Sequence, residues 1–305
     1  MYERYLKLLS KFTSLAVLST VFVFAAQPSA TAATTYPLTI ESAGYTTVIK
    51  AKPSKIISLS PTATEILFAI GAGPQVLAVD DQSNYPNGVP KSALSGFDPN
   101  IEAIVAQKPD LVILSVDSAK SKVVNESLTK LGIPVVMEKA AARISDSYSE
   151  ITLLGAATDN DVTSKALVKK MKNSIKSILK SALKKPKYRF FHELDETLYS
   201  ATSKTFIGSV YKDFGLKNIA DAAKGADKSG YPQITAEYLI RSNPQIIFLA
   251  DSYASQSAAT VKARAGWATI DAVKNNKIVV LPPDIPSRWG PRIVDFYKIV
   301  AAAIK

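Results

Sequence analysis

Short apolar runs alternate with amphipathic stretches along the chain from residue 55 onward. The runs at 56–59, 76–79, 134–137 and 278–281 are four residues long and mostly apolar, and stretches with helical spacing follow several of them. Runs of this kind predict strands buried on both faces, as in a parallel sheet. Their alternation with helices predicts an α/β fold. Before them, residues 36–50 alternate in the manner of a short hairpin around a glycine.

One helix–proline–strand unit occurs twice in the chain. Residues 101–114 read IEAIVAQKPDLVIL and residues 236–249 read AEYLIRSNPQIIFL, so that Glu102 aligns with Glu237. In each copy a side-chain acceptor precedes the helix, and the acid lies in the first turn, where the helix dipole favours it. A proline ends each helix, and an apolar strand follows. The repetition predicts two similar lobes.

The beginning of the chain has the pattern of an export signal. Basic residues open it, the stretch 14–26 is weakly polar to apolar, and Ala-Thr-Ala at 30–32 matches a cleavage site. We therefore predict a signal peptide over 1–33 and a secreted, extracytoplasmic protein. The alternative is that the segment is retained as an N-terminal anchor.

The remaining chain is divided by its charge pattern. From residue 161 to 187 there are nine lysines and one acid, and apolar residues recur there at helical spacing. This predicts a long amphipathic helix over 159–185 with a solvated lysine face, between an N-terminal lobe at 34–158 and a C-terminal lobe at 186–305. The helix accounts for most of the net charge of +11. Nucleic-acid binding would require aromatic or arginine residues among those lysines, so we predict no nucleic-acid partner.

The chain contains no cysteine. This excludes disulfides, thiol catalysis, cysteine-based zinc sites and a lipid attached to cysteine at the cleavage point. We therefore predict that the protein is not a lipoprotein.

Several segments of the chain together are typical of one protein family. They are Lys-Ile-Ile-Ser-Leu-Ser-Pro-Thr-Ala-Thr-Glu at 55–65, Asn-Tyr-Pro at 84–86, 101–110, 198–207, Tyr-Pro-Gln-Ile at 231–234, and Pro-Arg-Ile at 291–293. In these segments the chain resembles the helix-linked (class III) substrate-binding proteins of ABC importers for vitamin B12, haem and iron-siderophores. The likeness covers nearly everything after residue 50 and is nearest to the B12-binding branch.

The resemblance implies an architecture and a function. It implies two Rossmann-like α/β lobes with mainly parallel sheets, joined by a long rigid helix, with the ligand in a cleft between the lobes. It also implies a monomer that delivers a metal chelate to the permease of an ABC importer. Such a protein has no cofactor of its own, its ligand being a corrinoid or an iron chelate.

The resemblance assigns roles to two sets of residues. Glu102 and Glu237 match the acids that dock onto arginines of the permease. The alternative is that each acid only stabilises its helix dipole, a contribution of about 0.3–1 kcal/mol. The positions that match ligand contacts lie where strands end or helices begin, and they are Tyr85, Phe97, Tyr199, Tyr231, Asp284, Arg288 and Trp289.

The ligand itself stays open between three classes. A corrinoid is favoured by the aromatic positions together with Asp284 and Arg288. A siderophore or haem would favour cationic groups in the cleft, for which the candidates are Arg143, Arg241, Arg288 and Arg292. Haem would also require an axial ligand, for which the candidates are His192, Tyr85 and Tyr199.

An enzyme is the main rival class. His192 and the acids Glu193, Asp195 and Glu196 could form a metal or acid–base cluster. However, His192 is the only histidine, which excludes a histidine-rich metal site, and no nucleophile-elbow, phosphate-loop or dinucleotide motif is present. We therefore predict no catalysis and no metal site. An envelope sensor with the same fold is a third possibility that the sequence does not separate.

Overall fold

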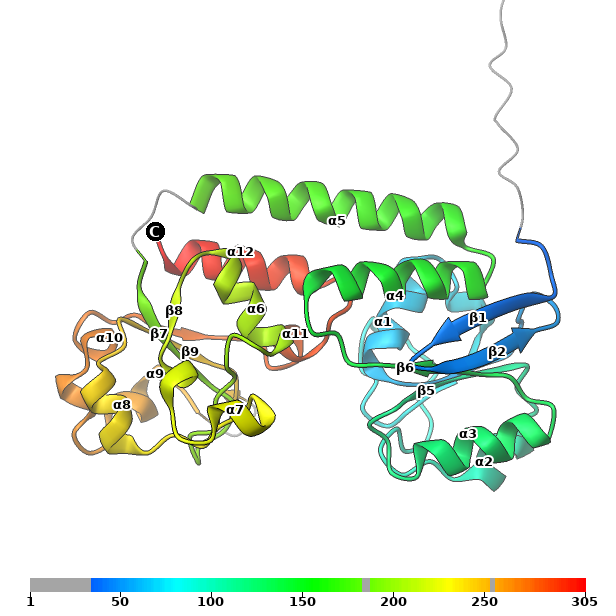
Figure 1. Cartoon of the computed structure of the whole chain (residues 1–305), viewed down its shortest axis with the longest axis horizontal. Coiled ribbons are helices and arrows are strands. Elements are labelled where there is room, and N and C mark those ends of the chain that lie inside the picture. Colours follow the sequence, from blue (N-terminus) through cyan, green and yellow to red (C-terminus); the bar gives the residue numbers. More distant parts are fainter. Residues whose placement is uncertain (1–33, 183–186, 253–255) are drawn as a thin grey trace, which may run out of the picture. The chain divides into compact units, whose positions relative to one another are not determined.

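The computed structural model describes residues 34–182, 187–252 and 256–305 (Figure 1). The predicted signal segment 1–33 and its cleavage site lie outside these residues. The described part contains two four-stranded sheets, both parallel throughout, and one antiparallel hairpin. The predicted α/β fold class with parallel sheets is therefore confirmed.

The first sheet has the strand order β4-β3-β5-β6. Its strands are β3 (Ile56–Leu59), β4 (Val76–Val79), β5 (Leu111–Ser115) and β6 (Val135–Glu138). The hairpin of β1 (Leu38–Ser42) and β2 (Tyr45–Ile49) lies against β6. All four residues of β3 are buried, because helices cover both faces of this central strand.

The second sheet repeats this topology with the order β10-β9-β7-β8. Its strands are β7 (Arg189–Glu193), β8 (Lys217–Asn218), β9 (Ile246–Leu249) and β10 (Ile278–Val280). Counted along the chain, both sheets have the spatial order second, first, third, fourth. The repeated sequence unit forms the third strand and the helix before it in each sheet. We call the part of the chain around each sheet a lobe.

Helices cover the sheets and connect their strands. In the first lobe they are α1 (Pro61–Ala69), α2 (Ile101–Ala106), α3 (Ser121–Lys130) and α4 (Ile144–Ala157), with the short 3-10 turn Gly73–Gln75. After α5 (Asp161–Ala182), the second lobe has α6 (Phe206–Asp213), α7 (Ala226–Ser229), α8 (Ala236–Ser242), α9 (Ala258–Lys262), α10 (Asp271–Lys274), α11 (Asp284–Ser287) and α12 (Ile293–Ala303). The described residues of this lobe also include the 3-10 turns Ile219–Ala222 and Trp267–Thr269.

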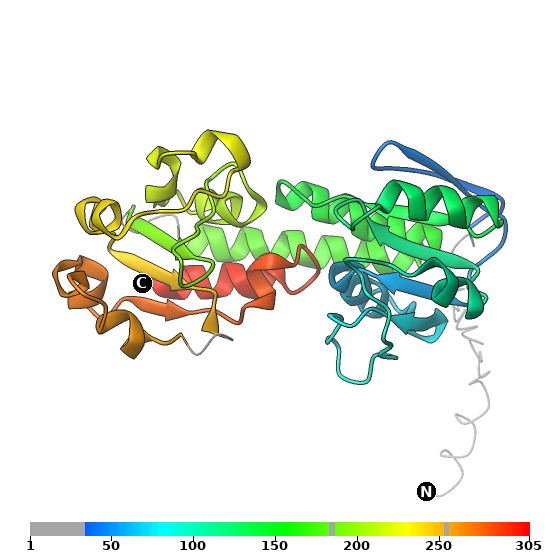
Figure 2. The same ribbon diagram turned by 90° about the horizontal axis from the view of Figure 1, so that it is seen from below.

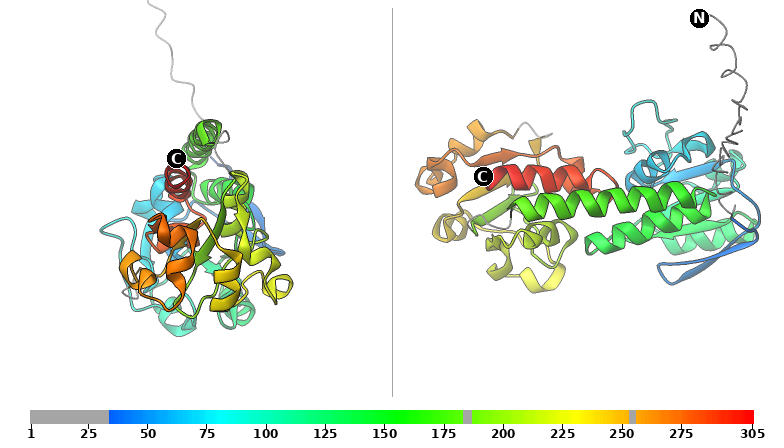
Figure 3. Two further views of the ribbon diagram at one scale, coloured as in Figure 1. Left: turned by 90° about the vertical axis from the view of Figure 1, so that its left-hand side faces the viewer. Right: turned by 90° about the horizontal axis from the view of Figure 1, so that it is seen from above.

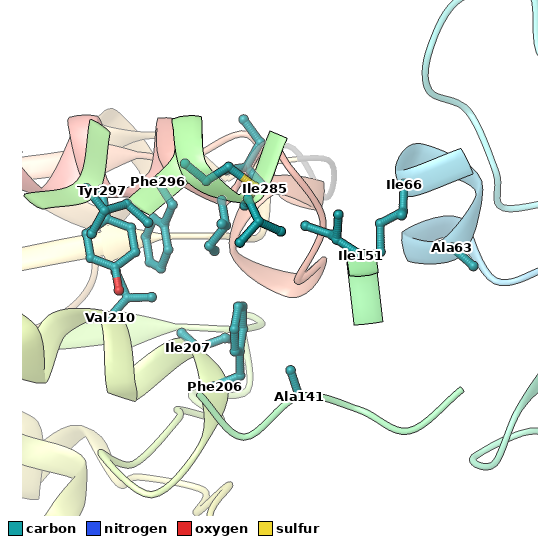
Figure 4. Close-up of a cluster of buried hydrophobic side chains, with 14 of the residues drawn as sticks. Ala63, Ile66, Ala141, Ile151, Phe206, Ile207, Val210, Ile285, Phe296 and Tyr297 are labelled. Carbon is teal, nitrogen blue, oxygen red and sulfur yellow. The ribbon is translucent and has the colours of Figure 1, made fainter. Parts of the chain in front are cut away.

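The lysine-rich segment, for which a helix over 159–185 was predicted, contains α5 over Asp161–Ala182. Its apolar face packs on α4 and α12, and Figures 2 and 3 show α12 running beside it. One hydrophobic core continues from the first lobe to the second through these helices. In Figure 4, Ile66 of α1, Ile151 of α4 and Ile285 of α11 belong to this continuous core. In the described part of the chain, no helix has both the length and the apolar character that a membrane span needs.

Candidate functional site

A loop of the second lobe is attached to the first lobe by one buried acid. Glu65, only 2% exposed, lies on the inner side of α1. Its Oε1 accepts a hydrogen bond from Arg288 Nη1 at 3.0 Å, and its Oε2 accepts one from Arg292 Nε at 2.9 Å. Arg292 Nη2 also donates to Glu65 Oε1. Ser60 caps α1 and Pro61 occupies its first turn, which fixes where Glu65 points.

The same loop is held by its tryptophan. Trp289 Nε1 donates to Glu150 Oε2 at 2.8 Å, and Ser147 Oγ donates to the carbonyl of Trp289. The indole meets the ring of Phe206 edge-on, with centroids 6.4 Å apart. Arg288 Nη1 donates to Asn84 Oδ1 at 2.8 Å as well. The loop that carries Asp284, Arg288 and Trp289 is thus fixed against the first lobe.

A pocket of about 350 Å³ lies between this loop and the carboxyl ends of the first sheet's strands. On open parallel sheets this edge is where ligands bind. Four acids line the pocket, and we call it the acid pocket. They are Asp80 after β4, Asp117 after β5, Glu138 at the end of β6, and Asp284. Phe97, which is 74% exposed, and Trp289 supply apolar contact.

Two of these acids are buried in different ways. Asp80 is fully buried, but it accepts hydrogen bonds from the backbone N–H groups of Gln82 and Ser83, both at 2.8 Å. Glu138 is 3% exposed, and neither of its carboxyl oxygens has a hydrogen-bond partner among the described residues. Burial raises the pKa of Glu138, and the carboxylates of Asp80 and Asp117 add to this effect.

Glu150 lies behind Glu138. Burial raises the pKa of Glu150 well above its ordinary value, and the negative charge of Glu138 raises it further. Glu150 accepts the indole N–H of Trp289 at the back of the site, while Glu138 lines the pocket.

The predicted aromatic positions of the second lobe face solvent. Tyr199 is 41% exposed and pairs with Gln233 in an isolated bridge, and Tyr231 is 42% exposed. Burial of its hydroxyl end raises the pKa of Tyr231, and the Asp117 carboxylate adds to the shift. Tyr231 is therefore near Asp117 of the acid pocket, although the two residues belong to different lobes.

Tyr85 lies in a different place. The guanidinium of Arg292 stacks over its ring at 4.1 Å, and its exposed edge lines a separate pocket beside α5 and α12. The structure thus brings Phe97, Asp284, Arg288 and Trp289 together in the acid pocket and leaves Tyr85 outside it. Whether any of these residues contacts a ligand stays a prediction.

The comparisons with known proteins give the family. The family described as "Periplasmic binding protein" matches residues 56–285. The chain belongs to this family. One relative, the ABC transporter substrate-binding lipoprotein YvrC of Bacillus subtilis, is 33% identical over 278 residues, which cover 88% of this chain and 86% of the relative. A vitamin B12-binding protein of Vibrio vulnificus is 26% identical over 258 residues, covering 81% and 89% of the two chains.

Solved structures of periplasmic binding proteins share the fold. A possible iron-binding (periplasmic solute-binding) protein of Staphylococcus epidermidis has 31% identity and a TM-score of 0.72, covering 83% of this chain and 99% of that one. The periplasmic vitamin B12-binding protein BtuF of Vibrio cholerae has 24% identity and a TM-score of 0.70, covering 82% and 96%. The predicted family is therefore confirmed, and the protein is a substrate-binding protein of an ABC transporter, which implies a membrane permease as partner.

The comparison with YvrC corrects the predicted localisation, which excluded a lipoprotein. That relative is named a lipoprotein. The prediction rested on the absence of cysteine in this chain, whereas the relative that carries this name is alike over 278 residues.

The two acids that match permease docking in this family are on the surface. Glu102 lies in the first turn of α2, which Asn100 caps, and Glu237 lies in the first turn of α8, which Thr235 caps. Both are exposed, and Figure 1 shows both helices on the side of the sheets away from α5. In the part of the chain that the structure describes, neither carboxylate accepts a hydrogen bond or forms an ion pair.

The residues that suggested an enzyme, His192 and the acids after it, do not gather in one cluster. His192 is fully buried, with Nδ1 2.8 Å from the Tyr211 hydroxyl, and burial lowers its pKa to about 3. Glu193 accepts two hydrogen bonds from Arg264, at 2.7 and 2.6 Å. Over the described ranges, no group of three or more potential metal-ligating side chains occurs.

The cationic candidates are also engaged away from the acid pocket, with Arg288 as the exception. Arg143 pairs with Asp146 at 3.3 Å, and Arg241 stacks over Tyr238 at 5.8 Å. Sequence reasoning did not identify Glu65, Asp80 or Glu138 as site residues. For Glu138 a signal exists, because it is an acid placed directly at the end of an apolar strand.

Proposed function

We propose that the protein binds a large metal chelate, a corrinoid, and delivers it to the permease of an ABC importer. It acts as a monomer, by binding alone, and carries out no reaction. The observation that carries this proposal is the set of large aromatic rings held in the open on loops of both lobes. These are Phe97, Tyr199 and Tyr231, which are 74%, 41% and 42% exposed.

Aromatic side chains exposed on loops provide apolar contact for a large flat ligand. A corrin ring offers a broad apolar face to such side chains and polar amide groups at its edge. Relatives named vitamin B12-binding proteins support this choice of ligand. The engagement of Arg288 and Arg292 by Glu65 also supports it, since haem carboxylates would require free cationic groups.

An iron chelate is the second candidate. It is favoured by the S. epidermidis protein of 31% identity, which is described as possibly iron-binding. An iron-siderophore of low negative charge would use the same aromatic rings.

The test is a binding titration of the purified protein with cyanocobalamin, haemin and a ferric hydroxamate. Trp289 lines the acid pocket, whereas Trp267 is buried in the core of the second lobe. A Trp267→Phe variant therefore reports the pocket through Trp289 fluorescence, and calorimetry on the unmodified chain checks each affinity. We expect saturable binding of cyanocobalamin at micromolar concentration or tighter. Saturation by the ferric hydroxamate alone would replace the corrinoid by the second candidate, and saturation by haemin alone would reject both.

A further inference from the structure

The acid pocket is negatively charged in a protein whose net charge is +11. Its lining contains four carboxyl groups and one guanidinium, that of Arg288. That guanidinium is already shared between Glu65 and Asp284, at 3.0 and 3.1 Å. Even when Glu65 and Arg292 are included, five carboxyl groups face two guanidiniums. The excess of basic residues, concentrated on α5, does not reach this pocket.

Glu138 is the residue that points to a ligand. It is 3% exposed, it lines the pocket, and both of its oxygens lack a hydrogen-bond partner among the described residues. A buried carboxyl group without partners is unfavourable, and the cost is recovered when donors reach it. Of the other acids of the lining, Asp117 is exposed to water, and the remaining two have donors. Asp80 accepts from two backbone N–H groups, and Asp284 accepts from Asn84 Nδ2 at 3.0 Å.

We propose that the acid pocket is the subsite for an N–H donor group of the ligand, an ammonium or a primary amide, and that it rejects ligands whose edge carries carboxylates. This inference rests on the proposed function and adds to it the polarity of the ligand's edge. The apolar face of the chelate lies against Phe97 and Tyr231, and its donor group enters between Asp117 and Glu138.

The geometry supplies both attraction and rejection. A cation beside two carboxylates is attracted more strongly at the effective dielectric of a partly buried site than in water. A carboxylate in the same place meets like charges, and Arg288, the guanidinium of the described lining, is already paired with Glu65 and Asp284. The pocket therefore discriminates between chelates of similar size by the charge at their edge.

Two matched pairs of probes test this. The first pair is cyanocobalamin and its derivative in which edge amides are hydrolysed to carboxylates. The second is ferrioxamine B, which carries a free ammonium group, and its N-acetylated form. Of these two pairs, one is expected to bind, depending on the chelate that the protein carries. Within that pair we expect the amide or ammonium form to bind at least about tenfold more tightly than the carboxylate or acetylated form.

Variants assign the preference to the pocket. Glu138→Gln keeps the shape of the side chain and removes its charge, and Asp117→Asn does the same at an exposed position where folding is not at risk. Both are expected to reduce the preference to less than about threefold. Glu126→Gln, an exposed acid on α3 outside the pocket, is expected to leave it unchanged. Equal affinity for both members of a pair would overturn the inference while leaving chelate binding, and so the proposed function, intact.

A second readout needs no chelate. Protein with ¹³C-labelled glutamate carboxyl groups is titrated with propylammonium and with propionate, and the Glu138 signal is assigned with the Glu138→Gln variant. The signal is expected to move with propylammonium and not with propionate. If it moves with both or with neither, the inference is wrong, whichever chelate the protein carries.

Discussion

At the scale of single residues, the side chain of Glu65 connects the two lobes. Breaking the contact between a buried acid and two arginines strongly destabilises a protein, because the charges that remain have no compensation. We expect Glu65→Gln to lower the free energy of unfolding by about 3–5 kcal/mol. Urea denaturation followed by circular dichroism measures this. Glu126→Gln, which removes an exposed charge on α3, serves as the matched control and is expected to change stability by less than about 0.5 kcal/mol.

A triple variant separates charge from packing at this point. Replacing Glu65, Arg288 and Arg292 together by leucine and methionine removes all the buried charges at once, and it is expected to recover most of the lost stability. A loss below about 1 kcal/mol in Glu65→Gln alone would mean that the two arginines find other partners.

His192 gives a pH dependence whose sign follows from its burial. Its pKa is 6.5 when unfolded and about 3 in the folded protein. Between these values the unfolded chain binds one more proton, so this residue's contribution to stability is complete above pH 6.5 and is lost as the pH falls. We expect the stability of the wild type relative to His192→Asn to fall by about 1.4 kcal/mol per pH unit across this window.

The comparison with His192→Asn is necessary because Glu193 acts in the opposite sense. Burial raises its pKa to about 7, so the folded protein binds the extra proton and gains stability as the pH falls from 7 towards 4.5. This contribution is common to both proteins and cancels in the difference. Urea unfolding at several pH values gives the measurement. A stability difference between wild type and variant that does not change with pH would show that His192 takes up a proton inside the fold as readily as in the unfolded chain.

Single residues were the least predictable part of the site. Both Ser60 and Thr62 are residue types that cap helices, and with Thr62 as the cap of α1, Glu65 would close a capping box. The structure shows Ser60 as the cap and uses Glu65 for a contact with Arg288, 223 residues away. Local patterns carry no information about such distant partners, and for that reason Arg288 was assigned to the ligand and Glu65 was not identified.

At the scale of elements, α4 and α5 meet at a position that only glycine allows. A methyl group at position 155 would overlap with the side chain of Ser164 on α5. Alanine is favoured over glycine in a helix by about 1 kcal/mol, yet overpacking costs about 1–3 kcal/mol. We therefore expect Gly155→Ala to lower the melting temperature despite its better helix propensity.

A compensating change tests the cause. Adding Ser164→Gly to Gly155→Ala removes the overlapping atoms and is expected to restore part of the loss, whereas Ser149→Ala on the exposed face of α4 should have little effect. If the double variant is less stable than either single variant, the overlap is not what limits this helix pair.

Elements were predicted far better than residues, because their signals are local. The apolar runs predicted the strands β3 and β4 with their bounds, and the caps Asn100 and Thr235 marked the starts of α2 and α8. The helix α11 gives no such local signal. Asp284–Ser287 forms one helical turn that packs against α12, and a segment this short has too few residues to show a helical period.

At the scale of the whole molecule, the repeated sequence unit becomes a repeated structural position. Both sheets have the same strand order, so the helix before the third strand occupies the same place in each lobe. Glu102 and Glu237 therefore stand at equivalent exposed positions, on the same side of the sheets (Figure 1). Stabilising a helix dipole would require no such correspondence, whereas a two-lobed permease surface would.

This correspondence leads to a prediction that separates docking from ligand binding. Glu102→Ala combined with Glu237→Ala is expected to leave chelate affinity unchanged, because both acids lie outside the acid pocket, and to abolish uptake. Transport of labelled chelate into cells that carry the cognate permease measures uptake, and calorimetry on the purified variant measures affinity. Glu126→Ala with Glu196→Ala removes one exposed acid from each lobe at unrelated positions and is expected to leave both unchanged. If uptake survives the Glu102→Ala and Glu237→Ala double change, the two acids only stabilise their helices, each by about 0.3–1 kcal/mol. The permease would then have to recognise another feature that the two lobes share.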